Sequence, residues 1–162
     1  MNNILSKICD DVRELNKELL DVIFMEGHSD ALLFTGLSAM QYSGLKTLYD
    51  AENNVLYENN CLLLKIYLDN MVPLQINSFV KPIHLNTIIL LGCRSLLRFD
   101  KKVARVVYGV DEATASSIAE MSYSEIKKIA GYSILKPAYR FEYCRKITSD
   151  VKVSPLLLNA SV

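Results

Sequence analysis

Apolar residues recur at steps of three and four along the first 24 residues of the chain, a spacing that predicts an amphipathic helix. The series, with acidic residues between its members, is Ile4, Ile8, Val12, Leu15, Leu19, Leu20, Ile23 and Phe24. Further helices are predicted over 31–35, 38–49, 85–99, 101–108, 112–120 and from about 123 to 130. The sequence therefore predicts a mainly α fold, a compact multi-helix domain.

The two short helices at 112–120 and 123–130 carry clear start signals. Asp111 is placed to cap the first, and Ser122 with Glu125 fits the capping box, in which each residue bonds the other's backbone amide. Two short helices that meet at such a corner resemble a helix-turn-helix, with Lys127 and Lys128 exposed on the second helix. Helical corners of this kind also occur in proteins that never contact DNA.

The chain divides by composition into two halves and a tail. We expect an acidic helical half, a linker that contains two prolines, a basic half and a tail, over 1–72, 73–82, 83–147 and 148–162. Alternating apolar and charged residues over 138–143 predict a short strand near the C-terminus.

Charge is distributed unequally along the chain. The totals are 18 Lys+Arg and 18 Asp+Glu, but residues 1–80 hold 5 and 11 while residues 81–162 hold 13 and 7, which gives −6 and +6. A zero net charge excludes a polycationic nucleic-acid wrapper. Either the basic half is available to phosphate, or the halves neutralise each other across an internal or dimer interface.

Several classes of protein are excluded or disfavoured. No apolar run is long enough to span a bilayer, and the polar N-terminus predicts no signal peptide, so we expect a cytoplasmic protein without membrane contact. The chain has no glycine-rich phosphate loop or nucleophile elbow, so we expect no enzyme. We also expect no metal or cofactor, because the cysteines and histidines are isolated: Cys9, Cys61, Cys93, Cys144, His28 and His84.

A resemblance arises in the basic half. The segments that carry it occur in the same order as in a known family: Gly109-Val-Asp-Glu, Ala115-Ser-Ser-Ile-Ala-Glu-Met-Ser, Lys128-Ile-Ala and Tyr139-Arg-Phe-Glu142. This run resembles the FlhD family, one subunit of the bacterial master activator of flagellar genes, whose relatives also activate transfer genes of conjugative elements. The helix from Ile83 to Phe99 is similar to the family's leading segment, so the resemblance covers roughly half of the chain.

The resemblance implies a DNA-binding subunit of a transcriptional activator. It would act at promoters in a hetero-oligomer with an FlhC-like partner that carries the zinc cysteines, and with RNA polymerase; homodimerisation is left open. The family usually has a cysteine before its Phe-Arg-Phe segment, where this chain has Pro137. A disulfide-linked dimer through that position is therefore not expected.

Basic residues of the second half are the candidate DNA contacts, since each phosphate contact releases counterions. The leading set is Lys127, Lys128, Arg140, Arg145 and Lys146, interleaved with aromatic residues. A second set shares helix faces at steps of four: Arg94, Arg98, Lys101, Lys102 and Arg105. The second set could contact phosphate or could pair with the acidic half inside an oligomer.

The first half is a candidate duplicate of the FlhD-like unit. An offset of 73 residues pairs Ala31 with Ala104 and Gly36 with Gly109, and it also aligns apolar positions such as Leu45 and Ile118. Two helical stretches also align this well by chance.

Two other functions stay open. The chain could be a helical adaptor or anti-activator without DNA contact, whose acidic half binds a basic partner. It could also be a helical domain that binds a small molecule.

Overall fold

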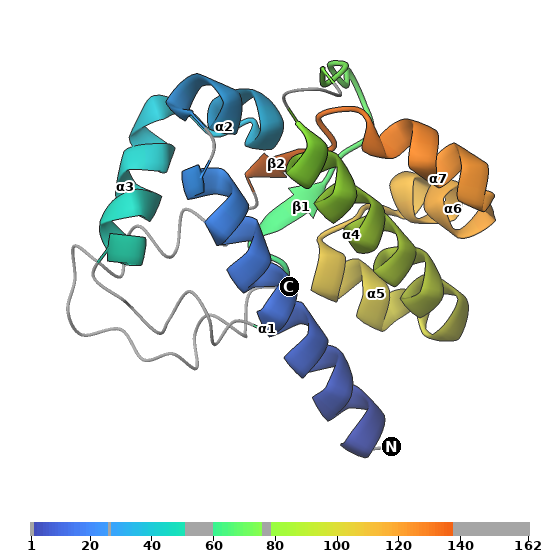
Figure 1. The fold of residues 1–162 in the computed structure, drawn as a ribbon. Helices are drawn as coiled ribbons and strands as arrows, with labels where there is room; N and C mark the ends of the chain where they lie inside the picture. The colour runs from blue at the N-terminus through green and yellow to red at the C-terminus, as the bar shows by residue number, and fades with distance from the viewer. Residues whose placement is uncertain (1, 26, 51–59, 76–78, 138–162) are drawn as a thin grey trace.

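The computed structural model describes residues 2–25, 27–50, 60–75 and 79–137, and it confirms the predicted mainly α fold (Figure 1). In this part of the chain, seven helices accompany one two-stranded sheet. The elements are α1 (Asn2–Met25), α2 (His28–Thr35), α3 (Ala39–Asp50), β1 (Leu64–Ile66), α4 (Val80–Phe99), α5 (Lys101–Tyr108), α6 (Glu112–Glu120), α7 (Tyr123–Ala130) and β2 (Leu135–Pro137).

The two halves meet at the sheet, which lies between the helices of the first half and those of the second (Figure 1). Strands β1 and β2 are antiparallel, with Leu64 opposite Pro137. Each strand also contacts the short helix of the other half, β1 against α5 and β2 against α2. One hydrophobic core therefore contains residues from both halves.

Two buried asparagines attach the long helices to the segments before the strands. Asn16 of α1 donates to the Cys61 carbonyl oxygen and accepts from the Leu63 amide, both at 2.9 Å. Asn86 of α4 donates to the carbonyl oxygens of Ala130 and Tyr132 at 3.1 and 3.0 Å. Because a buried amide needs such partners, these contacts fix where each long helix lies against the sheet.

Two helices begin earlier than the sequence predicted. The cap of α2 is Gly27 and its first residue is His28, so the expected start at Ala31 is wrong. The start of α4 is Val80 instead of Leu85, and Pro82 lies in its first turn. A proline is tolerated there because the amides of the first turn have no intrahelical acceptor. Residues 80–82 of the predicted linker are thus helical.

The halves repeat the same order of a long helix, a short helix and a glycine. Both α2 and α5 have eight residues, they lie 73 positions apart, and they end at Gly36 and Gly109, which have φ values of 65° and 64°. The equivalent Ala31 and Ala104 are both fully buried. The strands are offset by 71 positions instead, and duplication stays a prediction.

The strand β2 lies just before the segment that alternation predicted as a strand. The predicted strand at 138–143 and the predicted tail at 148–162 lie outside the described residues.

Candidate functional site

Both helices of the predicted corner are capped as the sequence indicates. The Asp111 carboxylate accepts the Thr114 amide at 2.7 Å, and this hydrogen bond lowers the pKa of Asp111. The Ser122 hydroxyl accepts the Glu125 amide at 3.2 Å, while the Glu125 carboxylate accepts the Ser122 amide at 2.7 Å. The hydrogen bonds from Ser122 lower the pKa of Glu125. These caps fix the start of each helix.

The second of these helices, α7, presents two lysines to solvent. Its Ile126 and Ala130 are buried in the core, whereas Lys127 and Lys128 are exposed. The Lys127 ammonium lies 5.8 Å from the centroid of the Tyr123 ring, within range of a cation–π interaction. Within the described residues neither lysine pairs with a carboxylate. We call Tyr123, Lys127 and Lys128 the α7 lysine face.

Two arginines of the second predicted set are used inside the fold. Arg94 donates to the Met121 carbonyl oxygen at 2.8 Å, and Arg98 donates to that of Ala119 at 3.1 and 3.2 Å. Both acceptors lie at the C-terminal end of α6, where carbonyl groups lack intrahelical partners. These arginines therefore stabilise the end of α6 against α4.

Other members of that set pair with an acidic residue of the same half. Lys101 and Arg105 both contact the carboxylate of Glu112, and the hydrogen bond from Lys101 is the main cause of the lowered pKa of Glu112. Lys102 is exposed. The alternative that this set pairs with the acidic half inside an oligomer stays a prediction.

The rest of the leading DNA-binding set lies outside the described residues. Arg140, Arg145 and Lys146 belong to 138–162. Of that set, the structure brings together Lys127 and Lys128 only.

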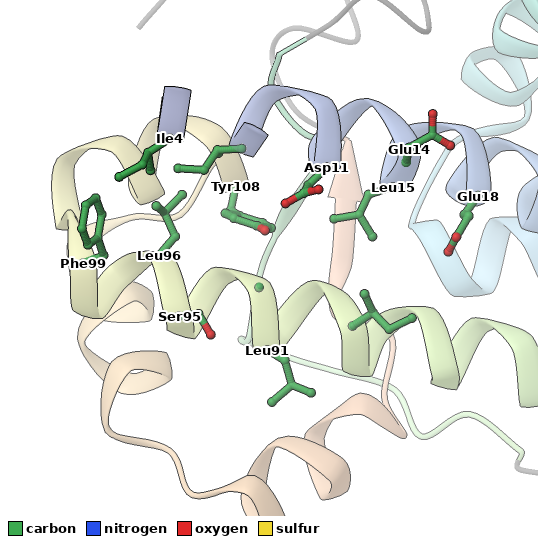
Figure 2. A pocket seen from close by; sticks show the side chains of 13 residues that line it. Ile4, Asp11, Glu14, Leu15, Glu18, Leu91, Ser95, Leu96, Phe99 and Tyr108 are labelled. Atoms are coloured by element: carbon green, nitrogen blue, oxygen red, sulfur yellow. The ribbon is translucent and has the colours of Figure 1, made fainter. Parts of the chain in front are cut away.

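Sequence reasoning missed a groove between α1 and α4, which has a volume of about 690 Å³ (Figure 2). Its lining is mainly apolar and includes three carboxylates. We call this site the α1–α4 groove, and the side chains and backbone that line it are Ile4, Ile8, Asp11, Glu14, Leu15, Glu18, Ile88, Leu91, Gly92, Ser95, Leu96, Phe99 and Tyr108. One signal in the sequence could have indicated the groove: the apolar residues of α4 cover a wider part of the helix than the face that packs on the core.

Tyr108 closes the groove from α5. Its ring is buried, and a Cβ atom added at Gly92 would lie only 2.5 Å from its hydroxyl oxygen. Burial, and to a lesser extent the charges of Cys93 and Asp11, raises the pKa of this phenol. Burial also raises the pKa of the Cys93 thiol to about 12. Burial thus disfavours the charged form of both groups.

Within the described residues, no three His, Cys, Asp or Glu side chains converge as a metal site would require. In the same part of the chain, no helix is long and apolar enough to cross a membrane.

Comparisons of the chain with family models, characterised proteins and solved structures found no match.

Proposed function

We propose that this chain is a DNA-binding subunit of a transcriptional activator and that it contacts the phosphate backbone through the α7 lysine face. The observation that carries the proposal is the pair Lys127 and Lys128, exposed and free of carboxylate partners in the described chain, on a helix fixed by a capping box. Such a helix supplies two cations to phosphate at fixed positions.

The proposal also rests on the resemblance of the second half to the FlhD family. An FlhC-like zinc-containing subunit, promoter DNA and RNA polymerase are the partners it implies. Arg94, Arg98, Lys101 and Arg105 are left out of the proposed DNA surface, because they already hold α5 and α6 in place. Lys102 stays a candidate secondary contact.

The test is a mobility-shift titration of duplex promoter DNA at low salt, with the chain alone and with an FlhC-like subunit. Lys127→Glu/Lys128→Glu should weaken binding across all sequences, because phosphate contacts carry no base information. The charge-matched control is Lys7→Glu/Lys17→Glu on α1, which should bind within about twofold of the wild type. Equal weakening by both double variants would contradict the proposal.

A second candidate function is a helical adaptor or anti-activator without DNA contact. The α1–α4 groove favours it, because an apolar site edged by carboxylates suits a protein partner better than a polyanion. Failure of the chain, with or without the FlhC-like subunit, to retard DNA at low salt would favour this second function.

A further inference from the structure

The α1–α4 groove leaves large apolar side chains exposed at one end. The side chains of Ile4 and Phe99 are 50% and 69% exposed, and they lie near each other at the end formed by the start of α1 and the last turn of α4 (Figure 2). Glu18 lies at the other end (Figure 2). Contiguous apolar surface of this kind, edged by polar residues, is typical of a protein interaction site.

The shape of the groove suits a helix. On α1 the lining residues follow steps of three and four from Ile4 to Glu18, and on α4 they do so from Ile88 to Phe99. At a rise of 1.5 Å per residue, the α1 wall is about 21 Å long, which matches four turns of a docked helix. Two helices side by side form a trough in which a third helix packs its apolar face.

The charge of the groove selects a basic occupant. Asp11, Glu14 and Glu18 line it, and no Lys, Arg or His among the described residues does. Glu14 pairs with Lys17 on its own helix, but Asp11 and Glu18 have no ion-pair partner in the described chain. Complementary charge favours encounter with a cationic partner and disfavours an anionic one.

A smaller cavity beyond the Glu18 end of the groove, between α4 and the later part of α1, lacks these properties. Its volume is about 360 Å³, and its lining includes Lys81 and His84 beside Glu18 and Asp21. When the two halves are aligned with an offset of 73 residues, Lys81 aligns with Ile8 and His84 aligns with Asp11. Among the described residues, the α1–α4 groove therefore combines apolar with acidic side chains, whereas the smaller cavity also has basic ones.

We propose that the α1–α4 groove binds one amphipathic helix of a partner protein, with large aliphatic residues on its apolar face and Lys or Arg on both flanks. This interaction is independent of DNA contact by the α7 lysine face, because no residue of α7 lines the groove. The partner could accompany the chain on DNA or act without DNA.

The probe is a fluorescein-labelled 18-residue synthetic helix of leucine and lysine, compared with the same peptide carrying glutamate in place of lysine. Fluorescence anisotropy with the full chain measures both affinities. We expect the lysine peptide to bind at least tenfold more tightly than the glutamate peptide. Hydrogen exchange should show protection by the lysine peptide in α1 and α4.

Apolar contact is tested with Ile4→Ser/Phe99→Ser, whose side chains are exposed enough that the fold should persist. This variant should bind the lysine peptide at least tenfold more weakly. Its control is Met25→Ser/Met40→Ser, which removes apolar side chains of similar exposure (66% and 63%) elsewhere and should stay within about twofold.

Charge contact is tested with Asp11→Asn/Glu18→Gln, which should weaken binding three- to tenfold. Its control is Asp69→Asn/Glu120→Gln, also exposed, which should have less than a twofold effect.

Three results would overturn the proposal. One is a dissociation constant for the lysine peptide weaker than about 1 mM at low salt. Another is equal weakening by the groove variants and their controls. The third is a chain that sediments as a dimer until Ile4→Ser/Phe99→Ser dissociates it, because the occupant would then be a second copy.

Discussion

In the first half of the chain, ion pairs join residues one turn apart on the same helix, whereas in the second half cations reach from one helix to the next. Asp10–Arg13, Glu14–Lys17 and Lys46–Asp50 are local pairs. Arg94 and Arg98 instead bind α6 carbonyl groups, and Lys101 and Arg105 bind Glu112. Exposed ion pairs of both kinds contribute little to stability, so the difference lies in what the contacts connect: one turn of a single helix in the first half, and α4, α5 and α6 in the second.

Side-chain caps occur in both halves. Gly27 and Phe79 precede α2 and α4 without a side-chain hydrogen bond, whereas Ser38, Asp100, Asp111 and Ser122 accept backbone amides at the starts of α3, α5, α6 and α7. The cap of α3 is reciprocal, as that of α7 is, because the Ser38 amide donates to the side-chain oxygen of Gln41 at 2.9 Å. The halves therefore differ in how their cations are paired and not in how their helices are capped.

The largest effects should come from the shared core. Leu20→Ala in α1 and Leu90→Ala in α4 each remove a fully buried side chain and should lower the free energy of unfolding by about 2–5 kcal/mol. Because both halves contribute to one core, each variant should shift the same single transition in urea, followed by circular dichroism. Two transitions, each sensitive to one variant, would show that the halves are independent domains.

Replacement of two helical glycines by alanine should change the free energy of unfolding in opposite directions. Gly92→Ala places a methyl group against the Tyr108 hydroxyl and should cost about 1–3 kcal/mol. Gly44→Ala in α3 meets open space, so it should stabilise the fold by about 0.5–1 kcal/mol through helix propensity. Thermal unfolding of the two variants measures both signs. Destabilisation by Gly44→Ala would mean that α3 is packed more closely than described.

Changes at two helix caps should have smaller and unequal effects on the free energy of unfolding. Ser122→Ala should cost about 1 kcal/mol, because the Glu125 amide loses its side-chain acceptor and the Glu125 carboxylate keeps only the backbone amide of residue 122 as a donor. Gly27→Ser should gain only a few tenths of a kcal/mol, since glycine is already a tolerated cap. Chemical denaturation of both variants measures the difference. If Ser122→Ala lowers the free energy of unfolding by less than Gly27→Ser raises it, the capping box is not a stabilising element.

Low pH should destabilise the fold mainly through carboxylates of the second half. The pKa values of Asp111, Glu112 and Glu125 are all lowered in the fold, so their contribution is present above their ordinary values of 3.8 and 4.5. It is lost as the pH falls below those values, through the lowered pKa values of the folded state. Glu112→Gln/Glu125→Gln should flatten the fall of the melting temperature below about pH 4.5. A slope equal to that of the wild type would contradict this assignment.

Features set by neighbouring residues could be predicted from the sequence, and features set by packing could not. Ser122 and Glu125 are three residues apart, so the capping box was predictable, as were the glycines that end α2 and α5. The acceptors of Arg94 and Arg98 depend on where α6 lies. The groove was missed because it requires α1 to pack beside a helix that is distant in the sequence. The start of α4 was missed because Pro82 was interpreted as a linker residue.

The central claim is that the second half of the chain contacts phosphate through Lys127 and Lys128. The most direct measurement is the salt dependence of duplex DNA binding by the wild-type chain, by Lys127→Gln/Lys128→Gln and by the control Lys7→Gln/Lys17→Gln. If both lysines contact phosphate, the first variant should reduce the magnitude of the slope of log K against log salt by up to about 1.8, and the control should leave it unchanged. An unchanged slope for Lys127→Gln/Lys128→Gln, or an equal reduction for the control, would contradict the claim.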